Sequence, residues 1–299
     1  MQAQLVKKLR ELTGSPIIQC KRALEECAND LTQAQEWLRL KGISQAHKKL
    51  KNSTQAGLVG GTLTSSSGYL LEVLCETDFV ARTDLFQKFT KDLLLSWSSS
   101  TLPFTSWPAL ALPSFSTSAE EAKLHTISKT QENVIIRRGV KYDSCPNSSV
   151  GVYLHNTLDP LLGFSGSIVK LKASKPLNAY TERINLLAFE ISMHIIAAKP
   201  LFLRKIDVPE DFRRKEMLAI EESLNDQMKA KEKSIIENIV KGKVEKSLDQ
   251  VCLYEQNFMI STDPEEKLVK DVLKTVSQEI SNDLEIEAYS LFACEGLNS

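Results

Sequence analysis

The sequence predicts an α+β protein with an N-terminal three-helix module, a core of two halves with antiparallel sheets and flanking helices, and a charged helical arm. Apolar residues recur with a helical period up to about residue 45 and alternate with a strand period from Gly57 onward. A strand pair accompanied by helices then occurs twice, which favours α+β over a parallel α/β sheet. Residues 209–249 carry many charges of both signs, which is typical of a solvent-exposed helix pair.

Composition limits the possible classes of function. A chain of 299 residues is long enough for about two domains. Its net charge of −1 gives no general attraction for DNA, RNA or an anionic membrane. No window has the roughly 18 to 20 apolar residues of a membrane span, and Met1–Leu9 predicts an amphipathic helix rather than a signal peptide. The six cysteines form no CxxC pair, so we expect free thiols in a reducing compartment.

Residues 1–48 are expected to form the three-helix module. Thr13–Pro16 separates the first two helices, because glycine favours a helix end and proline a first helical turn. Asn29-Asp30 supplies a cap for the third helix. The apolar positions that mark the helices are Leu5, Val6, Leu9 and Leu12, then Ile17, Ile18, Ala23, Leu24 and Cys27, then Leu31, Ala34, Trp37, Leu38 and Leu40. A bundle this small holds little core and suits a binding role.

Residues 49–142 are expected to form the first α+β half. It begins with a hairpin whose turn is Ser65–Gly68. Residues 98–118, rich in serine and proline, are interpreted as a surface insertion. The expected elements are strands Gly57–Thr64 and Tyr69–Glu76, a helix from about Thr83 to Trp97, a helix from Ala119 to about Glu132, and a strand Asn133–Val140.

Residues 143–299 are expected to form the second half, with the arm at about 209–249. Pro200 ends its long apolar helix. The expected elements are strands Val150–His155 and Gly166–Lys172, a helix Thr181–Lys199, a strand near Val251–Tyr254, a helix Pro264–Ile280 and a last strand Ile286–Cys294. The two apolar stripes of the arm are Met217, Leu218, Leu224 and Met228, and then Ile236, Val240, Val244 and Leu248.

The segment Glu76–Val80 is the most informative part of the chain. If the strand alternation continued through it, Phe79 would fall on the buried face. Thr77 and Asp78 instead favour a turn and a helix start, because their side-chain oxygens can bond free backbone N–H groups. A turn would leave the Phe79 ring at a loop tip beside a carboxylate, which suits insertion into a partner's cleft. From the residues alone, a core position for Phe79 with Asp78 as a helix cap is the simpler interpretation.

Four stretches of the sequence together resemble the elongation factor Ts family, in the family's order. They are Thr13-Gly14 with Cys20–Leu24, then Leu71–Val80, then Glu132–Arg138, then Met193-His194 with Lys199-Pro200. Members of that family are guanine-nucleotide exchange factors of elongation factor Tu. The resemblance implies a module like a ubiquitin-associated (UBA) domain and a core of two related halves, in some members with a helical arm.

The resemblance also implies how the partner is bound. The residues that would contact elongation factor Tu, in its GDP-bound or nucleotide-free form, are Thr77, Asp78, Phe79 and Val80, together with Ile17, Ile18 and His155. The first four would reach between helices of the GTPase domain and disturb its magnesium and phosphate sites, so that GDP leaves. The two isoleucines would bind through the module, and the histidine would bind through the second half. The stretch after it, Asn156–Pro160, departs from the family pattern.

Two other classes of function compete with an exchange factor. A UBA-like adaptor without exchange activity would use the module alone, but that interpretation leaves the larger core unexplained. An enzyme has the least support, because the sequence has no P-loop, no GxSxG and no metal-ligand spacing. We therefore expect no catalytic residues, no metal and no cofactor.

The sequence also bears on nucleic acid and compartment. Basic residues in Arg39–Lys51 lack interleaved aromatic side chains to stack bases, so no direct RNA binding is expected. We also expect no DNA and no membrane partner. Within the family, the low glycine and alanine content and the serine-rich insertion point to an organelle. The mitochondrial matrix is the expected compartment, with the bacterial cytoplasm or a plastid as alternatives.

Overall fold

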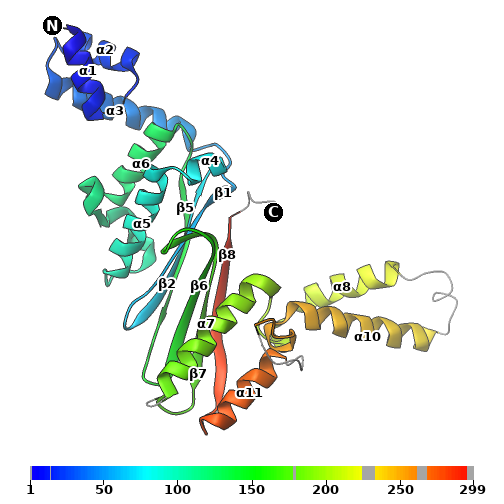
Figure 1. Ribbon diagram of the computed structural model, residues 1–299. Helices are drawn as coiled ribbons and strands as arrows, with labels where there is room; N and C mark the ends of the chain where they lie inside the picture. Colours follow the sequence, from blue (N-terminus) through cyan, green and yellow to red (C-terminus); the bar gives the residue numbers. More distant parts are fainter. Residues whose placement is uncertain (1, 14, 178–179, 224–232, 261–267, 295–299) are drawn as a thin grey trace.

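The computed structural model describes residues 2–13, 15–177, 180–223, 233–260 and 268–294, and it confirms the α+β class. The N-terminal module lies at one end of the core, and the arm projects from the other half (Figure 1). The elements up to the middle of the chain are α1 (Gln2–Thr13), α2 (Ile17–Glu26), α3 (Leu31–Lys49), β1 (Ala56–Leu63), β2 (Ser67–Cys75), α4 (Asp78–Ala81), α5 (Asp84–Ser98), η1 (Phe104–Ala109), β3 (Ala111–Leu112), η2 (Pro113–Phe115), β4 (Thr117–Ser118), α6 (Ala119–Thr130) and β5 (Ile135–Asp143). Those that follow are β6 (Ser148–Asp159), β7 (Leu162–Ala173), α7 (Thr181–Ala198), η4 (Lys205–Asp207), α8 (Glu210–Glu222), α10 (Lys233–Val251), η5 (Leu253–Glu255), α11 (Val269–Glu279) and β8 (Leu284–Ala293).

The N-terminal module consists of α1, α2 and α3, as predicted. Asp30 caps α3 by accepting a hydrogen bond from the Gln33 N–H at 2.9 Å. The small core of the module is Leu9, Cys20, Ala23, Leu24, Ala34 and Leu38. Helix α3 continues beyond this core and packs against α6. A Cβ atom at Gly42 would lie 2.5 Å from Ser128 Oγ, so the absence of a side chain permits this close approach.

The two halves share one sheet, whereas the sequence pattern predicts a separate strand pair in each half. Among the described residues, six strands run in the order β5-β2-β1-β7-β6, with β8 also paired to β7. The hairpins β1–β2 and β6–β7 are antiparallel, as predicted. They are joined where Val59 and Gly60 of β1 pair with Gly163 and Leu162 of β7. Backbone hydrogen bonds therefore connect the first half to the second.

The sheet is also packed face to face on itself. Val59 and Leu70 from the first half share a small core with Val150, Ile168 and Phe292 from the second. Helices α5 and α6 cover the outer face of the first half, and α7 and α11 cover that of the second (Figure 1). Strand β2 is consequently buried on both faces along its whole length.

This packing accounts for a buried carboxylate. Glu72 lies on the opposite face of β2 from Leu71, as the alternation predicts, yet it is fully buried between the two strand layers. Its oxygen Oε2 lies 2.7 Å from Arg138 Nε and 3.7 Å from Arg137 Nη1. The register of β2 and β5 shifts between Glu72 and Val73, and this irregularity brings both arginines to one carboxylate. A regular strand would have sent them to opposite sides.

The insertion, residues 98–118, folds as η1, a two-stranded β3–β4 ladder and η2 rather than as an irregular loop. Its aromatic residues fix it to the helical layer. The Phe104 ring packs on Trp97 at 4.8 Å between centroids, and Phe115 packs edge-on against Phe89 at 6.0 Å. The serine-rich composition thus indicated the surface position but not the ordered packing.

In the second half, the strand expected near Val251–Tyr254 is wrong. Helix α10 runs to Val251, and the short 3₁₀ helix η5 follows. The segment is apolar because Leu253 is buried against α7 and α11, and its backbone forms an isolated bridge with the segment 201–203 instead of joining the sheet. A short buried run has no period that separates a strand from a helix end. Helix α11 begins at Val269, and Leu268 before it forms an isolated bridge with Asn257. Residues 264–267 of the expected helix 264–280 lie outside the described residues.

His194 on α7 is fully buried and hydrogen-bonded. Its Nδ1 accepts a hydrogen bond from the Met259 N–H at 3.3 Å, which leaves Nε2–H to donate to Gln256 Oε1 at 3.2 Å. Burial lowers the pKa of His194 below its ordinary value, because the charged ring would be desolvated. Protonation of Nδ1 would also destroy the bond from Met259.

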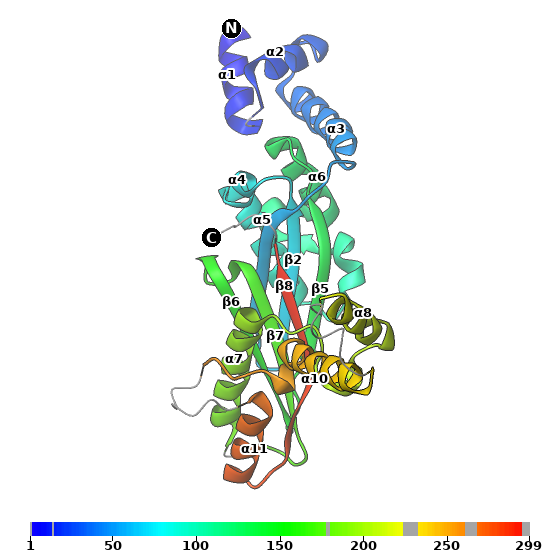
Figure 2. The same cartoon turned by 90° about the vertical axis from the view of Figure 1, so that its right-hand side faces the viewer.

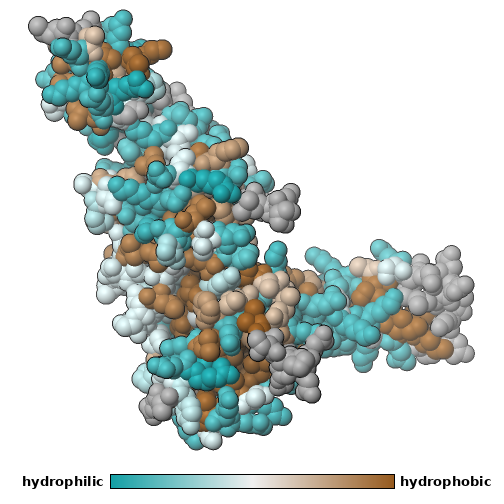
Figure 3. Space-filling model, in the orientation of Figure 1, coloured by the Kyte–Doolittle hydropathy of each residue, from teal (hydrophilic) through white to brown (hydrophobic). Residues whose placement is uncertain are grey.

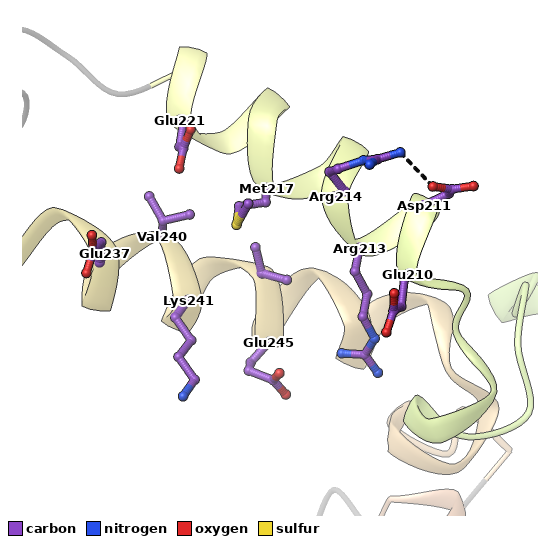
Figure 4. A pocket seen from close by; sticks show the side chains of 11 residues that line it. Glu210, Asp211, Arg213, Arg214, Met217, Glu221, Glu237, Val240, Lys241 and Glu245 are labelled. Carbon is purple, nitrogen blue, oxygen red and sulfur yellow. Dashed lines mark hydrogen bonds and ion pairs between the residues drawn. The ribbon is translucent and has the colours of Figure 1, made fainter.

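The charged arm is a pair of helices, α8 and α10. The stripe predicted for α10 is buried at Val240, Val244 and Leu248. The stripe predicted for α8 is correct only in part: Met217 lines the groove toward α10 although it is 41% exposed, and Leu218 is exposed. The residues of α8 that pack against the buried cluster of α10 are Phe212 and Ile220. The rest of that stripe, Leu224 and Met228, lies outside the described residues. Figure 4 shows Met217 and Val240 directed toward the groove between the helices, with charged side chains along its rim.

Candidate partner-binding surface

The predicted insertion segment forms a turn at the end of β2. Helix α4 is only one turn long, and Thr77 begins it by accepting a hydrogen bond from the Val80 N–H to its Oγ1 at 3.4 Å. The ring of Phe79 is 79% exposed, so the strand alternation does not continue through it. Helix α4 lies at the same end of the core as the module (Figure 1, Figure 2). A large apolar side chain therefore projects from a backbone turn.

The two residues that follow Phe79 anchor this turn. Val80 is only 9% exposed and Ala81 is fully buried, and both belong to the core beneath α5. Val80 was expected to face the partner with Phe79, but its burial makes it an anchor instead. The Thr83 hydroxyl donates to the Val80 carbonyl at 2.7 Å and caps α5. The turn thus has its apolar anchor and its exposed ring at consecutive positions.

Side chains from distant segments also hold the turn. Glu132 accepts hydrogen bonds from the Thr77 hydroxyl at 2.6 Å and from the Thr77 N–H at 2.9 Å. The Cys75 thiol donates to the Thr77 carbonyl at 3.1 Å. Burial, with a smaller contribution from Glu132, raises the pKa of Cys75 to about 12. The thiol therefore stays protonated and acts as a donor rather than a nucleophile.

Asp78 is linked to the second half through Arg82. Its carboxylate lies 3.9 Å from Arg82 Nε, and the Arg82 guanidinium sits over the Phe164 ring at 4.9 Å from the centroid. Phe164 belongs to β7, and its neighbour Ser165 pairs with His155 across the ladder. The structure thus connects the Phe79 turn to the strand pair that carries His155.

His155 is exposed near the tip of the β6–β7 hairpin. Its Nδ1 lies 3.3 Å from the Tyr153 hydroxyl, and Tyr153 packs edge-on against Phe189 of α7. Asn156 follows with a left-handed φ of 52°, which bends the strand directly after the histidine. Figure 3 shows hydrophobic surface on the face that α7 crosses. The exposed His155 thus lies against the half-buried ring of Tyr153, which in turn packs on Phe189.

The isoleucine pair opens α2 at the far end of the molecule. Ile18 is 82% exposed and Ile17 is 53% exposed, although the rest of the α2 stripe forms the core of the module. Ile17 lines a shallow groove between α1 and α2, which Val6 and Lys21 also border. Neither side chain is part of the buried core, so both are available for a partner.

The described residues show no group of side chains arranged for chemistry on a small molecule. Among them, no group of three or more His, Cys, Asp or Glu side chains is placed to hold a metal ion. None of the helices in the described segments combines the length and hydropathy needed to cross a bilayer. The features that stand out are the exposed apolar side chains.

Sequence reasoning missed the residues that support the turn. Glu132 lies 55 positions from Thr77 in the chain, and Arg82 acts through Phe164 of the other half. The sequence does contain a signal for Glu132, because the polar pair Glu132-Asn133 lies between the predicted helix and the strand that follows it. A polar pair at such a junction is available to bond the end of a neighbouring strand, but its partner depends on the sheet register.

Comparison with known proteins agrees with this architecture. The family model for elongation factor TS matches residues 76–292, and the model for the N-terminal part of mitochondrial elongation factor Ts matches residues 1–49. The elongation factor Ts of Paramagnetospirillum magneticum is 34% identical over 97% of this chain and 90% of its own length. The proteins of Rhodospirillum rubrum (34% identity, 97% and 91%) and Gluconobacter oxydans (35%, 91% and 87%) are similar to the same extent. This chain belongs to the elongation factor Ts family of translation elongation factors.

Proposed function

We propose that this protein promotes GDP release and GTP exchange on elongation factor Tu. The observation that carries the proposal is the Phe79 ring, 79% exposed on a turn whose two ends are anchored in the core. An exposed ring on a fixed frame is suited to enter a cleft of another protein, because little conformational entropy is lost on binding. Family membership supplies the partner.

The mechanism follows from differential binding. A GTPase holds GDP through a magnesium ion and a phosphate loop, so the nucleotide leaves when those ligands are displaced. An exchange factor acts by binding the nucleotide-free or distorted GTPase more tightly than the loaded one. In this proposal Phe79 enters between helices of the GTPase domain and disturbs the magnesium and phosphate sites. Thr77 and Asp78 shape the turn, and Val80 anchors it.

Burial of Phe79 alone supplies too little binding energy to account for a large acceleration of exchange. Burial of a phenylalanine side chain supplies roughly 1.5–3 kcal/mol. Each 1.4 kcal/mol or so changes an affinity about tenfold, so the ring accounts for roughly 10- to 100-fold. The remaining affinity for the distorted GTPase must come from other contacts. We assign these to Ile17 and Ile18 on the module and to His155 on the second half.

The proposed protein is an exchange factor without catalytic chemistry of its own. It requires no cofactor, and its partner is a protein rather than DNA, RNA or a membrane. We further propose the mitochondrial matrix as its compartment. The support is the N-terminal family model, which describes mitochondrial proteins, whereas the relatives named above are bacterial.

Release of a fluorescent GDP analogue from elongation factor Tu tests the proposal. The nucleotide is preloaded, chased with unlabelled GDP, and its loss is followed with and without this protein. We expect catalytic amounts to accelerate the release severalfold or more. Release at the spontaneous rate, with elongation factor Tu from both a mitochondrial and a bacterial source, would overturn it.

A further inference from the structure

The junction between α6 and β5 carries polar side chains that reach the Phe79 turn from another part of the chain. We propose that Glu132 is a positioning residue for exchange: it fixes the orientation of Phe79 through Thr77, while its neighbour Asn133 bonds the same junction to the end of the N-terminal module. This inference rests on the function proposed above. Glu132 touches neither Phe79 nor, in this proposal, the partner.

Both carboxylate oxygens of Glu132 are engaged by one residue. Oε2 accepts the Thr77 N–H at 2.9 Å, and Oε1 accepts the Thr77 hydroxyl at 2.6 Å. A hydroxyl has one proton and two lone pairs. Once its proton is donated to Glu132, a lone pair of Thr77 Oγ1 faces the Val80 N–H that it caps at 3.4 Å. Glu132 therefore fixes the position of both the Thr77 backbone N–H and the Thr77 hydroxyl that caps α4.

The turn depends on this support because it is too short to hold itself. Helix α4 comprises only Asp78–Ala81, and an isolated helical turn fixes several dihedral angles for one hydrogen bond. The Phe79 ring is largely exposed, so its own contacts do not determine its direction. The backbone frame from Thr77 to Val80 determines it instead.

The two hydrogen bonds from Thr77 to Glu132 form a clamp on the turn, and neighbouring contacts connect this clamp to the module. Asn133, the next residue, is fully buried, and its N–H donates to Glu76 Oε1 at 2.7 Å. Its Nδ2 donates to the carbonyls of Leu50 at 3.3 Å and Asn52 at 2.9 Å, directly after α3. Asn52 Nδ2 in turn donates to Glu76 Oε1 at 2.8 Å. The end of the module and the start of the turn are thus bonded to the same junction.

The test compares Glu132→Ala, Glu132→Gln and Glu279→Ala in the fluorescent-GDP assay at saturating protein. Glu279 is a matched control, since it is a helix-end glutamate that pairs with Arg183 at 3.5 Å in the second half. We expect Glu132→Ala to lower the maximal release rate about tenfold, because two charge-assisted hydrogen bonds are lost. Glutamine keeps one acceptor and should retain an intermediate rate, and Glu279→Ala should match the wild type.

A double-mutant cycle shows whether Glu132 acts through the ring. If it does, Glu132→Ala lowers the rate little further in a Phe79→Ala background. A wild-type rate for Glu132→Ala, or a loss that is fully additive with Phe79→Ala, would overturn the inference. If the wild-type protein itself fails to accelerate release, the proposed function fails instead, and the rates of the variants carry no weight.

Amide hydrogen exchange tests the clamp independently of activity. In Glu132→Ala, the amides of Thr77 and Val80 should exchange about tenfold faster or more, while that of Leu71 in the buried strand β2 stays protected. Unchanged exchange at Thr77 would overturn the positioning role even if activity fell. Equal acceleration at Leu71 would also overturn it, because the effect would then be a general loss of stability.

Discussion

Truncation of Phe79 to alanine removes the ring while leaving its anchors in place. About four-fifths of the side chain is exposed, so only the remaining fifth contributes to the fold. With roughly 1.5–3 kcal/mol for complete burial, the free energy of unfolding should fall by under about 1 kcal/mol. The part available to the partner corresponds to roughly 1.2–2.4 kcal/mol. That difference predicts a decrease of about 7- to 50-fold in the acceleration of GDP release.

The assay is the release of fluorescent GDP from elongation factor Tu, measured over a range of exchange-factor concentrations. Ile206→Ala is the matched control, because Ile206 is 86% exposed and lies on η4, outside the proposed contacts. Urea unfolding of both variants verifies that their stability is close to that of the wild type. Wild-type exchange by Phe79→Ala, or an equal loss in Ile206→Ala, would refute the assignment of Phe79 as the inserted residue.

Three further predictions concern other parts of the molecule. Ile18→Ser should raise the concentration for half-maximal exchange about tenfold with little change in the maximal rate, because an exposed docking contact affects binding. A titration that shows a lower maximal rate at an unchanged half-maximal concentration would contradict this. Burial lowers the pKa of His194 below 6.5. Between the folded pKa and 6.5 the unfolded chain therefore binds a proton that the folded chain does not. The free energy of unfolding is consequently highest above pH 6.5 and decreases as the pH falls toward the folded pKa. Urea unfolding should show His194→Asn losing less stability than the wild type between about pH 7.5 and 5.5, by at most about 1.4 kcal/mol per pH unit, and an equal loss would contradict it. A thiol reagent on the native protein should label exposed Cys145 first and Cys75, whose pKa is raised to about 12, only after unfolding; early labelling of Cys75, identified by mass spectrometry, would contradict it.

The local elements could be predicted because their signals are local. Thr13–Pro16 separates α1 from α2, and Asp30 caps α3, through interactions within a few residues of chain. The hairpin β1–β2 follows from alternation on both sides of a polar turn. In such segments, the residues that specify the element also lie within it.

What the sequence did not reveal depends on residues that meet only in the folded chain. Glu72 alternates correctly, but its burial requires the second strand layer to cover β2. The clamp on Thr77 requires Glu132 to arrive from the end of α6. Phe79 itself could be placed either in the core or at a turn tip. The choice is made by Val80, which enters the core one position later and leaves Phe79 directed outward.

In the proposed exchange mechanism, this alternation of anchor and exposed ring explains how so short a segment can act. A flexible loop would lose conformational entropy when its ring entered a cleft, and that cost would offset much of the roughly 1.2–2.4 kcal/mol available from burial. Val80 and Glu132 impose the order in the free protein, where the core and the hydrogen bonds to Thr77 offset the cost. The burial energy of Phe79 is then available to distinguish the distorted GTPase from the loaded one. Contacts at Ile18 and His155, on separate elements, can supply affinity without having to make that distinction.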